Sequence, residues 1–337
     1  MTDFISIIVP CYNERDTIGL LLQAIELQTY PLNLIQTVIA DGMSEDGTRE
    51  MITTYAQAHP KLSICLVDNP TRVIPAALNL AIEAARGDVI VRLDAHSIPR
   101  PDYLERCMNV MHETGAANVG GCWEIQPSGK GWISRSIAVA AAHWLGAGDA
   151  RYRIRGQAGE VDTVPFGAFR REWVQRVGPF DETLLSNEDY EFNLRLRKAG
   201  GLVWFDPGIR SVYFARGDLL SLARQYWRYG YWKARMLRRY PGSMRLRQAL
   251  PILFVLALLV LLVAAPFFNL AVTLLSIQLA LYAGVSVTAG LLEAFRRRDL
   301  TLLLGFPMAI WTMHFAWGIA FLWSTISGLI GGQSESG

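Results

Sequence analysis

The segment DVIVRLDAH (residues 88–96) decides the fold, because a continuous apolar run ends there in an acid and a histidine. A short run of this kind is typical of a strand buried on both faces of a parallel sheet. In an extended chain Asp94 and His96 point to the same side, since they lie two positions apart. A carboxylate and an imidazole on one face can hold a divalent metal. They can equally be a polar strand end that meets solvent.

Three similar apolar runs precede this one, and a helical pattern separates each run from the next. The predicted strands are residues 6–10, 36–41, 62–68 and 88–94, and the predicted helices are Asp16–Gln28, Gly47–Ala58 and Pro75–Ala85. This alternation predicts an α/β fold with a parallel sheet that helices cover on both faces. Ligands of such sheets bind at the carboxyl ends of the strands, where Pro10, Asp41, Asp68 and Asp94 lie.

The pattern beyond Asp94 is mixed. It predicts a helix over 101–113, a strand over 118–125, a strand with a turn over 161–169, a helix over 187–201 and a strand over 202–207. The apolar segment 131–148 fits either a buried helix or a helix at a membrane surface.

Composition divides the chain in two. Hydrophobic residues make up 51% of the 337 residues, and the mean hydropathy of +0.22 is high for a soluble protein. Charges occur throughout the chain up to about Trp204 and nearly vanish from Leu250 onward. The net charge of +2 gives no dominant basic field, so nucleic acid is not an expected partner. None of the four cysteines forms a C-x-x-C pair, which argues against a zinc ribbon and favours reduced cytosolic thiols.

The carboxyl-terminal third predicts membrane spans. The apolar stretch from Leu250 to about Val272 is long enough to cross a bilayer, and a second runs from about Leu270 to Leu292 after a short APFFN turn. Residues 300–330 form either one tilted span or a broken pair, which makes three or four in total. The basic clusters before the first span and after the second (residues 295–299) place both on the cytoplasmic side. The amino-terminal segment lacks a signal-peptide pattern, so the α/β part is expected to be cytosolic.

A basic, aromatic segment precedes the spans. Residues 224–247 contain eight Lys or Arg and no acid, interleaved with Tyr and Trp. RNA binding can use such a mixture. Its position directly before apolar segments favours a helix at the membrane interface.

Four acidic signals stand out in the first two thirds of the chain, and each has a purely structural alternative. Glu14 opens a helix, where it would complement the helix dipole. Asp41 precedes a Gly-rich turn, for which turn chemistry is an equal explanation. The Asp94 and His96 pair is the third. Glu188 and Asp189 start a helix; adjacent carboxylates there either complement the dipole or raise each other's pKa, which suits a general base.

Together these motifs resemble family 2 glycosyltransferases of the GT-A fold. The matching segments are SIIVPCYNE (6–14), VIADGMSEDGT (38–48), NPTRVIPAALNLAIEAARGDVIVRLDAH (69–96), VPFGAFRRE (164–172), VGPFDE (177–182) and NEDYEFNLRLRKAG (187–200). The resemblance covers about residues 5–205. It is strongest to membrane-anchored bacterial exopolysaccharide glycosyltransferases of the succinoglycan glucosyltransferase type. It implies a Rossmann-like nucleotide-sugar-binding domain, which we expect over 1–215. The composition beyond it predicts basic aromatic interface helices over 216–248 and three or four transmembrane helices over 249–332.

The resemblance assigns roles by position. Asp41 would face the base of the nucleotide, Asp94 would be the metal-binding acid of a D-x-D motif, and Asp189 would be the catalytic base. The remaining donor-binding positions would be Pro10, Tyr12, Glu14 and Arg72, with Arg72 approaching the diphosphate. Glu188 would assist acceptor binding or site closure.

Two positions depart from the family pattern. His96 stands where D-x-D has its last acid, and as a metal ligand imidazole suits Mn²⁺ better than Mg²⁺. The segment QYWRY (225–229) has Tyr229 where processive synthases of the family carry Trp in Q-x-x-R-W. Gln225 and Arg228 could close over the site, or the segment could be an interface helix without catalytic contact.

The resemblance implies an inverting, metal-dependent hexosyltransferase that uses Mn²⁺ or Mg²⁺. The expected donor is a UDP-hexose such as UDP-glucose, and the expected acceptor is a polyprenyl-diphosphate-linked saccharide in bacterial exopolysaccharide assembly. The expected place is the inner (cell) membrane, with several spans, a cytoplasmic catalytic domain and other assembly enzymes as partners. The alternatives are a processive polysaccharide synthase, a polyprenyl-phosphate sugar transferase and a non-catalytic nucleotide-sugar-binding membrane subunit. A transporter subunit is disfavoured because His314 is the only ionisable residue in mid-span, and a dinucleotide-binding dehydrogenase because G-x-G-x-x-G is missing after the first strand.

Overall fold

The computed structural model describes residues 3–331, and their contacts divide the chain into two compact units. The first unit comprises Met1–Glu124 and Arg151–Tyr213, and the second comprises Ile125–Ala150 and Phe214–Gly337. The ambiguous apolar segment after residue 130 therefore belongs with the carboxyl-terminal helices.

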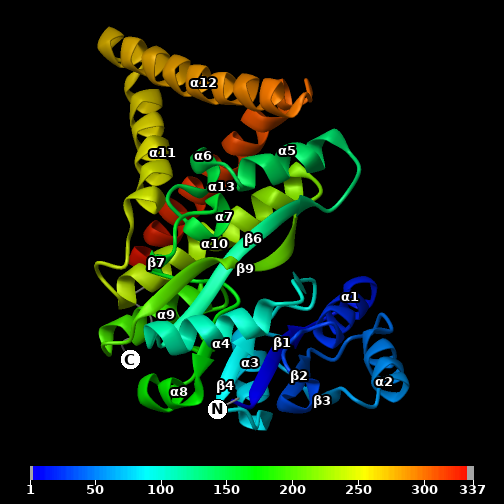
Figure 1. The fold of residues 1–337 in the computed structure, drawn as a ribbon. Coiled ribbons are helices and arrows are strands. Elements are labelled where there is room, and N and C mark those ends of the chain that lie inside the picture. The colour runs from blue at the N-terminus through cyan, green and yellow to red at the C-terminus, as the bar shows by residue number, and fades with distance from the viewer. Residues whose placement is uncertain (1–2, 332–337) are drawn as a thin grey trace. The chain divides into compact units, whose positions relative to one another are not determined.

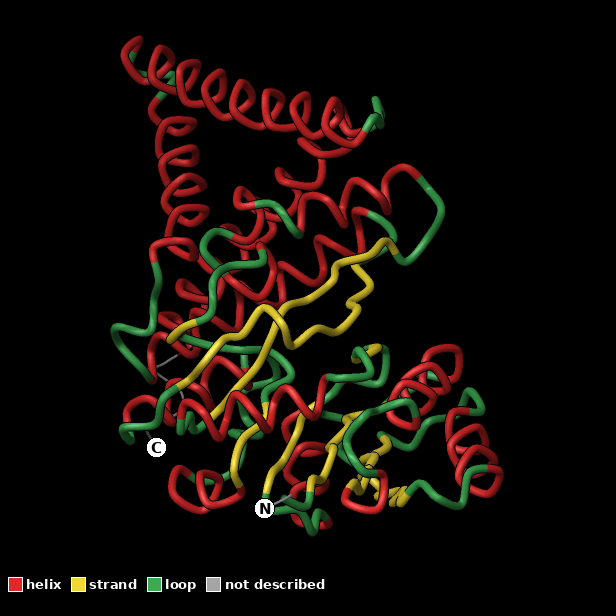
Figure 2. Tube along the Cα trace, viewed as in Figure 1, coloured by secondary structure: helices red, strands yellow, loops and turns green. Residues whose placement is uncertain are grey.

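A mixed sheet forms the centre of the first unit (Figures 1 and 2). Its strands are β1 (Ile5–Cys11), β2 (Ile35–Asp41), β3 (Ser63–Asp68), β4 (Val89–Arg92), β5 (Ile98–Pro99), β6 (Asn118–Pro127), β7 (Gly159–Glu160), β8 (Ala168–Arg170) and β9 (Val203–Ala215). The order is β3-β2-β1-β4-β8-β6-β9-β5, with β7 paired to β9. The first four strands are parallel, as predicted, and β8 joins β4 in the antiparallel sense.

Helices cover both faces of the parallel part. The helices of the first unit are α1 (Arg15–Glu26), α2 (Thr48–Ala58), α3 (Ile74–Ala84), α4 (Tyr103–Thr114), α7 (Arg151–Ile154), α8 (Arg171–Val177) and α9 (Glu188–Lys198), with a 3-10 turn at Leu32–Leu34. Ile7 and Val9 of β1 pack into one core with α1 and α4, and Ile8 between them packs into the other core with α3 and α9. Because alternate residues of one strand enter both cores, the strand is apolar throughout, as the sequence indicated.

The structure corrects two predicted strands. Residues 161–167 are loop rather than strand, and only β8 remains of that prediction. Pro165 has no N–H to donate to a ladder, and Phe166 adopts a left-handed φ of 50°, so the chain cannot continue extended there. The predicted strand over 202–207 is longer than expected, since β9 continues to Ala215.

The second unit consists of helices. They are α5 (Trp132–Ala141), α6 (Trp144–Ala147), α10 (Leu219–Arg239), α11 (Leu246–Ala264), α12 (Asn269–Arg297) and α13 (Leu302–Gly331). The long helix α13 packs against α5, α10, α11 and α12 (Figure 1). A Cβ at Gly230 of α10 would lie 2.3 Å from the Trp317 carbonyl oxygen, so the close approach of α10 to α13 requires glycine.

Three helices of the described chain, α11, α12 and α13, are long and apolar enough to cross a membrane. The predicted turn lies between the end of α11 at Ala264 and the beginning of α12 at Asn269. The last apolar stretch is one continuous helix, α13, and not a broken pair. Exposed leucine, valine and phenylalanine side chains along α11 and α12 are consistent with lipid contact.

Candidate active site

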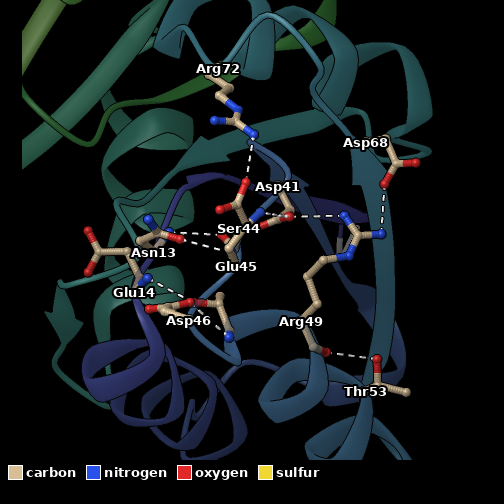
Figure 3. Close-up of polar contacts among 11 residues, drawn as sticks. Asn13, Glu14, Asp41, Ser44, Glu45, Asp46, Arg49, Thr53, Asp68 and Arg72 are labelled. Atoms are coloured by element: carbon tan, nitrogen blue, oxygen red, sulfur yellow. Dashed lines mark hydrogen bonds and ion pairs between the residues drawn. The ribbon is translucent and has the colours of Figure 1, made fainter.

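The carboxyl ends of β1, β2 and β3 bring the first group of predicted residues together. Cys11 lies opposite Asp41, and Asp41 lies opposite Asp68, across neighbouring strands. The Arg49 guanidinium spans the two acids, with Nη1 2.9 Å from Asp41 Oδ2 and Nη2 2.7 Å from Asp68 Oδ1 (Figure 3). Sequence reasoning did not identify Arg49, whose role follows from the register of β2 and β3.

Asp41 is fully buried and holds the turn that follows β2. Its carboxylate accepts hydrogen bonds from the Ser44 backbone N–H (2.9 Å) and the Ser44 hydroxyl (2.6 Å), in addition to Arg49. Turn chemistry is thus one role of Asp41. Its predicted contact with a nucleotide base stays a prediction.

The loop after β1 is fastened to the loop after β2. The Asn13 N–H donates to Ser44 Oγ (2.8 Å), and Asn13 Oδ1 accepts from the Glu45 N–H (3.1 Å). The Glu14 N–H donates to Thr48 Oγ1 at 2.9 Å. We call residues 10–14 and 41–48 the donor loops, because the predicted nucleotide-binding residues concentrate there.

Arg72 lies over the donor loops from the segment that precedes α3. Its guanidinium stands 5.4 Å from the centre of the Tyr12 ring. Its Nη2 pairs with Glu45 Oε1 at 3.1 Å (Figure 3). The side chains of Arg72 and Glu45 are 46% and 77% exposed. An exposed pair of this kind is weak, so Arg72 can exchange Glu45 for the phosphate oxygens of a ligand at little cost.

Glu14 is directed at His96 rather than at the Asp41 and Arg49 pair. Its Oε1 lies 3.0 Å from His96 Nδ1, and its Oε2 accepts a hydrogen bond from the Thr17 hydroxyl. Figure 3 shows the Glu14 carboxylate pointing away from Asp41. Thr17 therefore holds Glu14, and Glu14 holds the His96 ring.

This arrangement fits a divalent cation. Metal-binding histidines usually donate the N–H of one ring nitrogen to a carboxylate, which leaves the lone pair on the other nitrogen. The Nδ1 of His96 faces the Glu14 carboxylate, and Asp94 lies two residues away, so the predicted roles of Asp94 and His96 as metal ligands stay predictions. Within residues 3–331 no group of three or more His, Cys, Asp or Glu side chains forms a complete metal site. The donor set therefore suits a cation whose remaining ligands are phosphate oxygens and water.

The second group of predicted residues surrounds Arg92, a residue that sequence reasoning did not single out. Arg92 Nη2 lies 3.1 Å from Asp94 Oδ1 and 3.0 Å from Glu188 Oε1, and Arg92 Nη1 pairs with Asp189 Oδ1. We call Arg92, Asp94, Glu188 and Asp189 the carboxylate cluster. The available signal was the single charge inside an otherwise apolar strand, because a buried Arg is rare unless it is paired.

Asp189 has the electrostatic character of a base. Burial, together with the nearby Glu188 and Asp94 carboxylates, raises the pKa of Asp189 to about 7, against the opposing effect of Arg92. A carboxyl group that titrates near neutral pH can accept a proton from a hydroxyl more readily than an ordinary aspartate.

Gln225 and Arg228 lie on α10, in the second unit. Gln225 Nε2 donates to the Tyr229 hydroxyl at 3.0 Å, and Arg228 is exposed. Their closure over the site stays a prediction, as does the contact of Pro10 with a nucleotide.

Comparisons with known proteins bear on the family and the fold of the chain. The family model described as Glycosyl transferase family 2 matches residues 6–178. The chain is 34% identical over 248 residues to the succinoglycan biosynthesis protein ExoA of Rhizobium meliloti (strain 1021), covering 73% of this chain and 74% of that protein. It is 28% identical over 243 residues to a dolichyl N-acetyl-alpha-D-glucosaminyl phosphate 3-beta-D-2,3-diacetamido-2,3-dideoxy-beta-D-glucuronosyltransferase of Methanococcus voltae, covering 70% and 75%.

Among solved structures, the fold is similar to the mannosyltransferase PcManGT from Pyrobaculum calidifontis, determined in complex with GDP-Man and Mn²⁺. The TM-score is 0.62 at 24% sequence identity, with 97% of this chain and 88% of that chain covered. This likeness shows the GT-A-like α/β fold of the chain.

Proposed function

The chain belongs to glycosyl transferase family 2, and we propose that it moves one sugar from a UDP-hexose to a lipid-linked saccharide with inversion at the anomeric carbon. The observation that carries this proposal is the carboxylate cluster. It places Asp94, at the end of a strand where ligands bind, and Asp189, whose pKa is raised to about 7, on one buried guanidinium.

In the proposed reaction Asp189 takes the proton from an acceptor hydroxyl. The acceptor oxygen forms a bond to the anomeric carbon, the bond from that carbon to the diphosphate oxygen breaks, and the nucleoside diphosphate leaves with the electron pair. Arg72 moves from Glu45 to the diphosphate and stabilises its growing charge. The donor loops hold the nucleotide, with the exposed Tyr12 ring available to it and the buried Asp41 carboxylate holding the turn at Ser44.

Asp94 and His96, with Glu14 behind His96, would hold a divalent cation at the diphosphate. Such a cation, when bound, supplies a Lewis acid that neutralises charge on the leaving group. The mixed carboxylate and imidazole donors favour Mn²⁺ over Mg²⁺.

The helices of the second unit support a lipid-linked acceptor. Three helices long and apolar enough to span a bilayer would keep the enzyme where a polyprenyl-diphosphate-linked saccharide presents its hydroxyl. The name of the Methanococcus voltae relative also describes a lipid phosphate acceptor. We place the protein in the bacterial inner membrane with the first unit in the cytoplasm, because the arginines before α11 and at the end of α12 mark the cytoplasmic side. Other exopolysaccharide assembly enzymes would supply the acceptor.

The test uses the full chain purified in detergent, a panel of UDP- and GDP-sugars, and a bacterial lipid extract as acceptor. Release of one nucleotide that requires Mn²⁺, is abolished by EDTA and is lost in Asp189→Asn would support the proposal. Release of nucleotide with polymeric product would indicate a processive synthase, and transfer to free polyprenyl phosphate a polyprenyl-phosphate sugar transferase. No transfer from any donor would refute the enzymatic assignment.

A further inference from the structure

Arg92 occupies an unusual place for a charged residue. It is the last residue of β4, which lies between β1 and β8, and its backbone N–H donates to the Gly167 carbonyl at 3.0 Å. Only 4% of the residue is exposed. A guanidinium at such a site requires charged partners, because its burial without them is very costly.

The partners of Arg92 are the groups on which the proposed chemistry depends. Different nitrogens of one planar guanidinium reach them: Nε and Nη2 reach Asp94 Oδ1 at 3.3 and 3.1 Å, and Nη1 reaches Asp189 Oδ1. Nη2 also contacts Glu188 Oε1 at 3.0 Å. Because the guanidinium is rigid, the separation of Asp94 from Asp189 is set by the geometry of a single side chain.

We infer that Arg92 is a positioning residue that holds the proposed catalytic base, Asp189, in register with the diphosphate-side acid, Asp94. This inference rests on the proposed function and adds a residue to it. One positive charge faces three carboxylates, so Arg92 also limits the repulsion that would otherwise drive the Asp189 side chain away from Asp94 and Glu188.

The inference predicts that loss of Arg92 lowers turnover without weakening the binding of Mn²⁺ and UDP. Loss of an arginine with a purely structural role would weaken both. Arg92 competes with a cation for the Asp94 carboxylate, since both bind the same acid. Removing the guanidinium should therefore leave the affinity for Mn²⁺ and UDP unchanged or higher. Turnover should fall, because Asp189 loses its alignment, and a misplacement of about 1 Å can cost on the order of a hundredfold in rate.

Arg171 is the matched control. Its guanidinium donates to three backbone carbonyls: that of Gly87 through Nε (2.8 Å), that of Ile82 through Nη1 (3.4 Å) and that of Ala85 through Nη2 (2.6 Å). Arg171→Met should lower the thermal midpoint and leave kcat unchanged. Arg92→Met should lower kcat with the affinity for Mn²⁺ and UDP preserved.

A further variant keeps the test decisive if Arg92→Met does not fold. Arg92→Lys keeps the positive charge but carries it on a single nitrogen, which cannot reach the three acids at once, so it should recover only part of the turnover.

For the wild type and these variants, nucleotide release gives kcat and the KM for the donor. Titration calorimetry gives the affinity for UDP in the presence of Mn²⁺. If the wild type transfers sugar and Arg92→Met or Arg92→Lys has the same kcat as the wild type, the inference is overturned and the proposed function stands. Parallel loss of turnover, Mn²⁺ with UDP binding and thermal midpoint in every Arg92 variant would also overturn it, in favour of a structural role. A wild type that transfers no sugar from any donor would overturn the proposed function and, with it, this inference.

Discussion

The donor loops and the carboxylate cluster hold their charged groups in opposite ways. At the donor loops, Arg72 pairs with Glu45 where both side chains are well exposed to solvent. In the carboxylate cluster, Arg92 is buried and joined both to Asp94, two residues away, and to Asp189, 97 positions away in the sequence. Exposed ion pairs rearrange at little cost in free energy. Removing one partner of a buried pair strongly destabilises the folded protein, because the other charge stays buried without compensation. The donor loops are therefore suited to binding and releasing a nucleotide, and the cluster is suited to keeping reacting groups in place.

Loss of the base should give the largest effect. Asp189→Asn should lower kcat by about 10²–10⁴-fold, the usual contribution of a general base, while Mn²⁺ and UDP still bind. The matched control is Asp88→Asn, which changes an exposed acid just before the opposite end of β4 and should leave kcat unchanged. Kinetics of nucleotide release and UDP titration measure the two quantities. Equal turnover in Asp189→Asn and wild type would show that the base lies elsewhere.

The activity and the stability of the protein should depend on pH in opposite directions, because both depend on the ionisation of Asp189. Asp189 must be ionised to accept a proton, so kcat/KM should fall as the pH drops below about 7. For folding the sign is opposite. The folded pKa lies above the ordinary value of 3.8, so the folded state binds this proton more tightly than the unfolded chain does. The stability that Asp189 contributes is complete below about pH 4 and is lost as the pH rises through about 7.

Thermal midpoints measured from pH 4 to 8 test this sign. The wild type should lose stability across that range relative to Asp189→Asn, whose amide does not titrate. Parallel curves for the two proteins would mean that the pKa of Asp189 is not raised in the folded protein.

The sequence predicted the strand ends better than the contacts that join them. Apolar runs followed by Asp41 and Asp94 were sufficient to place these acids at the carboxyl edge of a parallel sheet. Arg92 was missed because its partners Glu188 and Asp189 lie on α9, and only the folded sheet brings that helix to β4. Glu14 was assigned to the nucleotide by resemblance, and its contact with His96 depends on how the β1 and β4 ends adjoin. The periodicity of apolar residues indicates which side of one helix or strand is buried. It does not indicate which side chains of two different elements come into contact.

Glu14 should affect cation binding through His96. Glu14→Ala should weaken Mn²⁺ binding in the presence of UDP by about 10–100-fold, as is typical when a carboxylate behind a histidine ligand is removed. His96→Ala should weaken it similarly, and the double variant should be little worse than either single variant, since both remove the same interaction. Mn²⁺ electron paramagnetic resonance gives the free and bound fractions without turnover. Additive losses in the double variant would indicate that Glu14 and His96 act independently.

Substitution of Glu45 should have the smallest effect on stability and activity. It tests whether the exposed pair at the donor loops contributes less to stability than the buried carboxylate cluster. Because the Glu45 and Arg72 side chains are both well exposed, Glu45→Gln should change the free energy of unfolding by less than about 1 kcal/mol. The same substitution frees Arg72 from its partner, so the KM for the donor should stay equal or fall, whereas Arg72→Met should raise it. Urea denaturation and donor titrations measure the two effects. A large loss of stability in Glu45→Gln would mean that the donor loops depend on this pair as the cluster depends on Arg92, and that the Arg72 side chain is not free to leave Glu45 for a diphosphate.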